Sequence, residues 1–144
     1  MTTRRRILIT EDDMARLKDL VGRGRMVSRL DDVHLEELAD ELDRAEVVAA
    51  EEVLPDVVTM NSTVRVRDLD NGRSVVYTLV FPGDADIDRH RISVLAPIGT
   101  ALIGYRAGDL IEWVTPSRTR RLQIEEVLFQ PEAADGRLLA EVRR

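Results

Sequence analysis

The segment TVRVRDLDNGRSVVYTLVF, residues 63–81, alternates apolar and polar side chains on both sides of a sharp turn. In residues 63–67 valine alternates with threonine and arginine, which is the period-two pattern of a half-buried strand. The Asp-Asn-Gly run at residues 70–72 is typical of a tight hairpin turn, and residues 74–81 supply the partner strand. The segment predicts a β-hairpin and places the middle of the chain in a sheet.

Three more strands are expected after this hairpin, at residues 91–95, 110–114 and 121–129. A short apolar helix around residues 100–103 follows the first of them. About five antiparallel strands around one helix define an α+β domain. The polar tail that begins at Pro131 is expected to be loosely ordered.

The residues before Pro55 follow helical spacing instead. Residues 7–9 form a short apolar run, and Thr10 with the three acids after it is suited to begin a helix. We expect that helix to end at Gly22 and Gly24. A second helix over residues 32–50 has apolar residues at alternating intervals of three and four, namely Leu35, Leu38, Leu42, Ala45 and Ala49. The pattern predicts an antiparallel helical hairpin, or short coiled coil.

The chain is therefore expected to divide into a helical hairpin at residues 1–54, a β-rich domain at 55–130 and a tail at 131–144. Residues 11–56 contain 15 acidic and 6 basic residues, a net charge of −9 in a chain of net charge −6. A solvated helix face is the simplest reason for such acids. Their charge disfavours contact with a phosphate backbone and favours a partner with a basic surface or channel.

Signs of catalytic chemistry are weak. The chain has no cysteine, and its two histidines, His34 and His90, are far apart in sequence. Nucleophile-elbow and phosphate-loop motifs are absent. Aromatic residues make up 3% of the chain, which argues against nucleic-acid stacking platforms and small-molecule pockets. We expect a binding protein that is not an enzyme and uses no metal or other cofactor and no small-molecule substrate.

The location of the protein is indicated by its apolar runs. None approaches the roughly 20 residues that cross a bilayer. The basic N-terminus is followed by only three apolar residues, which is too few for a signal peptide. We expect a cytoplasmic protein without a membrane partner.

Asp31 and Asp32 are adjacent carboxylates at the predicted tip of the hairpin. One interpretation is that they cap the second helix, a role that aspartate fills well. The other is that they share a Mg²⁺ ion with carboxylates of a partner, because Mg²⁺ accepts one or two protein ligands and retains its waters. Capping is the simpler of the two.

A family resemblance is carried by three segments. LAPIGTALIG at residues 95–104, followed by Gly108 and Asp109, resembles the signature of the C-terminal domain of the Gre transcript-cleavage factors, which is FKBP-like. ELDRA at residues 41–45 and DVVTMNS at 56–62 resemble Rnk-like regulators of nucleoside diphosphate kinase in the same family. The resemblance extends from about residue 7 to residue 134.

This resemblance implies a transcription regulator whose partner is RNA polymerase, with DNA associated only indirectly through the polymerase. The FKBP-like domain would dock at the rim of the polymerase secondary channel through Ala96, Pro97 and Ile98, and the coiled coil would point into the channel with Asp31 and Asp32 at its tip. A purely structural interpretation competes at the rim loop, since Pro97 is suited to begin a helix and Ile98 to fill the core.

The resemblance leaves two modes of action. Gre factors place acidic residues beside the catalytic Mg²⁺ of the polymerase and stimulate RNA cleavage, whereas Rnk-like proteins have a shorter hairpin, do not stimulate cleavage and compete with other channel-binding factors. At about 1.5 Å per residue, the second expected helix spans roughly 28 Å and the first roughly 20 Å. These lengths favour the Rnk-like mode, with a cleavage factor acting through Asp31 and Asp32 as the alternative.

Two further alternatives come with the resemblance. An FKBP-like fold suggests a prolyl isomerase, although the few aromatic residues of the domain are partly needed for its core. Direct control of nucleoside diphosphate kinase is the other, and no residue pattern indicates a kinase-binding site. An effect on the kinase would then be indirect, through transcription.

Overall fold

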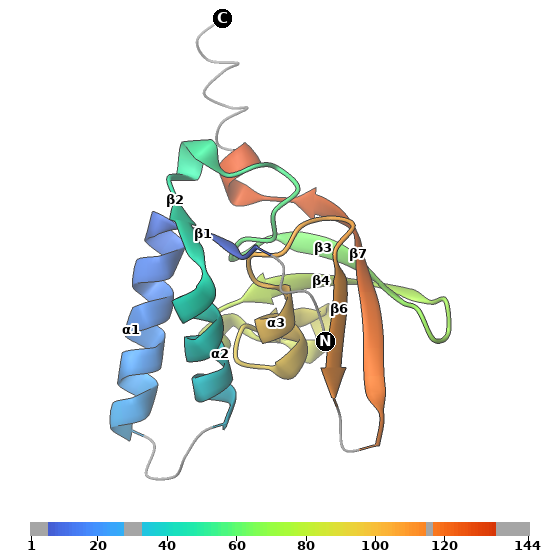
Figure 1. Cartoon of the computed structure of the whole chain (residues 1–144), viewed down its shortest axis with the longest axis horizontal. Coiled ribbons are helices and arrows are strands. Elements are labelled where there is room, and N and C mark those ends of the chain that lie inside the picture. Colours follow the sequence, from blue (N-terminus) through green and yellow to red (C-terminus); the bar gives the residue numbers. More distant parts are fainter. Residues whose placement is uncertain (1–5, 28–32, 115–116, 135–144) are drawn as a thin grey trace, which may run out of the picture.

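The computed structural model describes residues 6–27, 33–114 and 117–134. Two helices, α1 and α2, lie side by side next to a five-stranded sheet, with a short helix, α3, between them (Figure 1). The chain is thus an α+β protein with an N-terminal helical part, as predicted. No helix within these ranges is long and apolar enough to cross a membrane.

The N-terminal part begins with strand β1 (Leu8–Thr10), which leads directly into α1 (Glu11–Val27). Helix α2 (Val33–Arg44) is followed by β2 (Glu46–Val48), which pairs with β1 in parallel. The hydroxyl Oγ1 of Thr10 accepts a hydrogen bond from the Asp13 N–H at 3.2 Å. This contact is the expected N-terminal cap of α1.

Both expected helix ends are wrong. Helix α1 continues past Gly22 and Gly24 to Val27. A Cβ atom at position 24 would lie 2.6 Å from Cδ1 of Leu35, so this glycine lets α2 pack closely against α1 and does not end the helix. Helix α2 ends at Arg44, not at residue 50, because residues 46–48 pair with β1 instead.

The apolar stripe of α2 is confirmed over its first three members. Leu35, Leu38 and Leu42 are buried, and Ala45 is partly buried against the core just after the helix. Ala49 lies beyond β2 and is not part of the helix. The stripe is therefore shorter than the sequence pattern indicated.

The sheet contains β3 (Thr63–Asp68), β4 (Ser74–Val80), β5 (Arg91–Ser93), β6 (Leu110–Val114) and β7 (Thr119–Phe129), in the order β5-β4-β3-β7-β6. The predicted hairpin is confirmed, with Thr63 opposite Thr78 and Arg67 opposite Ser74. Strand β7 is antiparallel to both β3 and β6.

One pairing differs from the all-antiparallel sheet that the sequence predicted. Strand β5 runs parallel to β4, with Thr78 opposite Arg91. Two short 3-10 helices, η2 (Pro82–Asp84) and η3 (Ile87–Arg89), return the chain along β4 before β5 begins. The sheet is mixed.

A single cluster of buried side chains joins the helices to the sheet. It includes Leu17 of α1 and Leu38 of α2, Leu102 of α3, Val64 of β3, Leu79 of β4 and Ile124 of β7. A smaller cluster contains Leu8, Val57 and Val53, the residue that follows the 3-10 helix η1 (Ala50–Glu52). The division of the chain at residues 54 and 55 stays a prediction.

The first residues of the expected tail are ordered. Residues 131–134 are helical, and Oε1 of Glu132 accepts a hydrogen bond from the Thr59 hydroxyl at 2.6 Å. The expectation of a loosely ordered tail is wrong at these positions, because a contact with a remote segment holds them. Residues 135–144 lie outside the described ranges.

Candidate partner-binding site

The helical arm, defined as α1 and α2, presents an acidic surface on α2. The sequence of α2, VHLEELADELDR, contains five carboxylates and one arginine. Four of these acids are exposed, namely Glu36, Glu37, Asp40 and Asp43. The two carboxylates predicted at the tip, Asp31 and Asp32, lie outside the described residues.

The predicted rim loop is the beginning of α3 (Pro97–Leu102). Pro97 occupies the first turn, where its missing N–H is not needed by the helix. Its side chain is exposed, whereas Ala96 and Ile98 are partly buried and Ile98 packs against the core. Pro97 thus begins a helix and Ile98 packs against the core, which are the two structural roles considered for them. Contact of this loop with a partner stays a prediction.

Helix α3 is held very close to β5. A Cβ atom at Gly99 would lie 2.0 Å from the carbonyl oxygen of Ser93, so only glycine fits without moving the backbone. The Thr100 hydroxyl donates to the carbonyl of Val94 at 2.6 Å. The rim loop is therefore fixed to the sheet, and α3 also contacts α2 (Figure 1).

The segment of residues 56–62, which follows the helical part, is held by backbone bonds on two sides. The Val58 N–H donates to Tyr105 O at 2.8 Å, and the Asn61 N–H donates to Leu79 O at 2.6 Å. Asn61 has a left-handed backbone with φ of 67°, and the Ser62 hydroxyl accepts from the Thr59 N–H at 2.9 Å. The left-handed backbone suits asparagine at position 61, and the side-chain bond needs the hydroxyl of Ser62.

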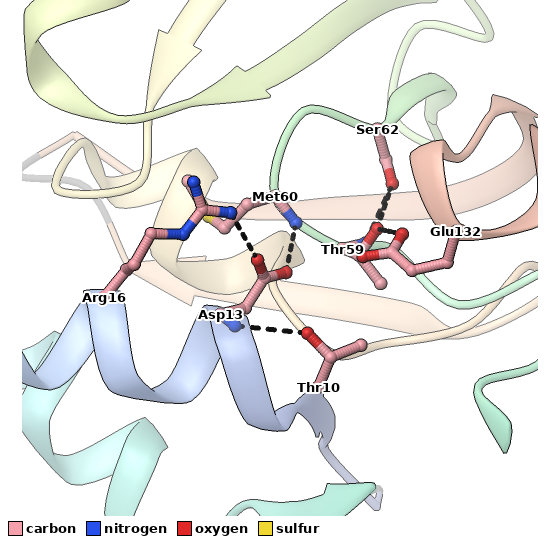
Figure 2. A network of polar contacts seen from close by, with 7 residues as sticks. All are labelled: Thr10, Asp13, Arg16, Thr59, Met60, Ser62 and Glu132. Carbon is pink, nitrogen blue, oxygen red and sulfur yellow. Dashed lines mark hydrogen bonds and ion pairs between the residues drawn. The ribbon is translucent and has the colours of Figure 1, made fainter. Parts of the chain in front are cut away.

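A first polar joint connects α1 to this segment (Figure 2). Asp13 is 2% exposed, and its Oδ2 accepts from the Met60 N–H at 3.0 Å. Its Oδ1 accepts from the Arg16 guanidinium at 3.1 Å. We call Asp13, Arg16 and Met60 the Asp13 joint.

Sequence reasoning missed this joint. It treated Asp13 only as one of three acids in the first turn of a helix. The available signal was the spacing of Thr10 and Asp13, which is that of a capping pair and marks position 13 as facing the chain before the helix.

A second joint connects the end of α2 to the loop after α3. Arg44 lies 2.6 Å from Oε2 of Glu41, and Tyr105 is close to both. Burial raises the pKa of the Tyr105 hydroxyl, and the Glu41 carboxylate raises it further. Burial by itself would lower the pKa of Arg44, but Glu41 and Tyr105 outweigh it and the pKa is raised. Arg44 acts on the Tyr105 pKa in the opposite direction and lowers it, but burial and Glu41 outweigh this effect.

Within residues 6–27, 33–114 and 117–134, no three His, Cys, Asp or Glu side chains form a group that could hold a metal ion. His34 is exposed on α2. His90 ends η3, and its Nδ1 lies 3.1 Å from the carbonyl oxygen of Val76.

Comparison with known proteins identifies the class. Residues 52–129 match the family model described as "Transcription elongation factor, GreA/GreB, C-term". A solved structure from Nitrosomonas europaea, titled "Prokaryotic transcription elongation factor GreA/GreB", is 42% identical with a TM-score of 0.70, covering 88% of this chain and 100% of that one. The chain belongs to the GreA/GreB family.

The N-terminal region refines this assignment. Residues 5–48 match the family model "Rnk N-terminus". The "Regulator of nucleoside diphosphate kinase" of Escherichia coli (strain K12) is 46% identical over 100 residues, which are 69% of this chain and 74% of that protein. The GreA of Orientia tsutsugamushi (strain Boryong) is 36% identical over 100 residues, but these are only 63% of its length. The predicted resemblance to both groups is confirmed.

Proposed function

We propose that this chain is a transcription regulator that binds RNA polymerase at the secondary channel, occupies its entrance and does not stimulate transcript cleavage. Family membership supports a Gre-like regulator. The exposed carboxylates of α2 support a partner with a basic surface. The protein would act by binding, not as an enzyme, and would do so in the cytoplasm.

The length of the helical arm is the observation that carries the absence of cleavage. Helix α1 has 17 residues and spans about 26 Å, and α2 has 12 residues and spans about 18 Å. We expected the second helix to be the longer one, but α1 is the longer one. Because neither helix exceeds about 26 Å, the arm is short as predicted. The match also covers more of the Rnk-type relative than of the GreA relative, which has further sequence outside it.

The primary test is retention of the chain by immobilised RNA polymerase, with and without a Gre factor as competitor. We expect retention that the competitor abolishes. Pro97→Glu tests the rim loop, because an acid in the first turn suits α3 and should leave the fold intact. Its control is Leu110→Glu on the exposed edge strand β6. Failure of the polymerase to retain the parent chain would contradict the proposal.

The second test separates the regulator from a cleavage factor. Stalled elongation complexes are incubated with the chain, and RNA length is followed on a gel. We expect no shortening. Shortening that disappears in the double variant Asp31→Ala/Asp32→Ala would instead establish the Gre-like mode and assign it to those carboxylates.

A prolyl isomerase is the less favoured function. Tyr77, Phe81 and Tyr105 pack against the hydrophobic core, which takes them away from a substrate pocket. We expect no turnover of a proline peptide. The sequence shows no pattern that indicates a kinase-binding site. We therefore expect the purified chain to leave the activity of nucleoside diphosphate kinase unchanged, and any effect on kinase levels to arise through transcription.

A further inference from the structure

We infer that Asp13 is a positioning residue, whose buried carboxylate sets the direction of the helical arm relative to the sheet. The contacts of the Asp13 joint lie within this chain and do not involve a partner. The consequence of this joint for polymerase binding rests on the proposed function. It adds to that function the residue that sets the direction of the arm.

The carboxylate bonds in two directions at once (Figure 2). Oδ2 faces the Met60 N–H, and Oδ1 faces Arg16 one turn further along α1. A buried charge is tolerated only where hydrogen bonds and an opposite charge compensate it. Because Arg16 is on α1 and moves with it, the bond from Met60 is the contact that a rotation of the helix would break, and the position of α1 that keeps this bond is preferred.

Met60 provides a fixed point for this bond. It is 1% exposed, and the neighbouring Asn61 N–H and Ser62 carbonyl are both hydrogen-bonded to Leu79 of β4. The Thr59 hydroxyl on its other side is bonded to Ser62 and Glu132. The Asp13 joint thus connects α1 to backbone that is itself hydrogen-bonded to β4 of the sheet.

Arg16 extends the joint to a second point on the same body. Its guanidinium carbon lies 5.0 Å from the ring centre of Phe81, the residue that follows β4. That distance is suitable for a cation–π contact. One side of α1 is therefore connected to the sheet both through Asp13 and through the cation that neutralises it.

Directional bonds matter here because α1 packs on the core through apolar side chains, namely Met14, Leu17 and Val21. Hydrophobic contacts are not directional and allow a helix to rotate or slide by small amounts, whereas a hydrogen bond weakens steeply as its angle departs from linear. Asp13 lies at the start of a helix about 26 Å long. A rotation of about 10° at the joint would displace the far end of the arm by roughly 4 Å.

The competing explanation is that Asp13 only stabilises the first turn of α1. Glu11 and Asp12 stand in the same turn and are exposed. They can interact with the helix dipole as well as Asp13 does. Asp12→Ala is therefore the matched control, since it removes the same charge from the same turn and leaves the contacts of Asp13 in place.

The direct test measures the orientation of the arm. The chain has no cysteine, so Lys18→Cys on α1 and Val76→Cys on β4, both at exposed positions, allow two spin labels to be attached specifically. Double electron–electron resonance then gives the distribution of distances between them. We expect one narrow distribution in the labelled parent and in Asp12→Ala, and a distribution broadened by at least about twofold in Asp13→Ala, whose arm has several orientations.

Asp13→Asn provides a milder variant should Asp13→Ala fail to fold. Its amide oxygen can still accept from the Met60 N–H, but its charge is lost, so we expect broadening between that of the parent and that of Asp13→Ala. An unchanged distribution in a variant that is folded by circular dichroism would overturn the inference. Equal broadening in Asp12→Ala would overturn it too.

Binding to polymerase tests the consequence. If only about a tenth of Asp13→Ala molecules hold the arm correctly, the apparent Kd rises roughly tenfold, with Asp12→Ala within about twofold of the parent. A broadened distribution with unchanged affinity would refute the role of Asp13 in binding. If the parent itself does not bind, the proposed function fails, and the distance measurement still decides whether Asp13 sets the arm.

Discussion

At the scale of single residues, Asp68 is a buried carboxylate that is paired on both of its oxygens. Asp68 at the end of β3 is 7% exposed, and Oδ1 accepts from the Asp70 N–H at 2.8 Å while Oδ2 lies 2.5 Å from the Arg120 guanidinium. The bond from the Asp70 N–H, assisted by Arg120 against the effect of burial, holds the pKa of Asp68 below its ordinary value of 3.8. This carboxylate therefore fastens the predicted hairpin turn to β7.

The lowered pKa gives a stability contribution with a defined sign. It is fully present above pH 3.8 and is lost as pH falls through the lower pKa of the folded state. We expect Asp68→Asn to be less stable than the parent near pH 7, with the difference shrinking below about pH 4. Urea unfolding across this range measures it. Asp70→Asn, at an exposed position, is the control, and a constant difference for Asp68→Asn would contradict the assignment.

At the scale of elements, α2 depends on what it packs against. Twelve residues are too few for a helix to be stable alone in water. Its apolar stripe of Leu35, Leu38 and Leu42 is buried, and Leu35 packs closely against Gly24 of α1. The arm is therefore a packed pair of helices and not two independent helices.

Leu38 is the central contact of that stripe and is 0% exposed. We expect Leu38→Ala to lower the free energy of unfolding by about 2–5 kcal/mol, because it removes buried methyl groups and leaves a cavity. Glu37→Ala, at the exposed neighbouring position, should change it by no more than about 0.5 kcal/mol. Chemical denaturation of both variants makes the comparison, and similar small effects would show that α2 does not depend on this packing.

At the scale of the whole molecule, the arm shares one buried cluster with the sheet and has two polar joints to the rest of the chain, one at Asp13 and one at Arg44. Gln130, just after β7, adds a third connection, since its Nε2 donates to the carbonyls of Leu54 and Val57 at 2.7 and 2.8 Å. Segments from the beginning, middle and end of the chain thus meet around residues 54–62.

This continuity predicts one cooperative unfolding transition. Far-ultraviolet circular dichroism reports mainly on the helices, and the fluorescence of Trp113, the only tryptophan, reports on β6. We expect the two signals to change at the same urea concentration, as two-state unfolding requires. Loss of the helical signal at clearly lower urea would instead support two independent units divided near residue 54.

Local patterns in the sequence determined much of this protein. The hairpin of residues 63–81, the cap at Thr10 and the helix begun by Pro97 depend on neighbouring residues, so each was predictable. The segments at residues 41–45, 56–62 and 95–104 together carried the family resemblance, and the last of them supplied the candidate rim loop.

Only the tertiary structure decided the rest. Helix α2 ends at Arg44 because β1 provides a partner strand for residues 46–48, and α1 passes Gly24 because Leu35 packs there. Asp13 is buried and accepts a bond from the N–H of Met60, 47 residues away, whereas Asp12 is exposed. In each case a partner distant in sequence decides between local alternatives.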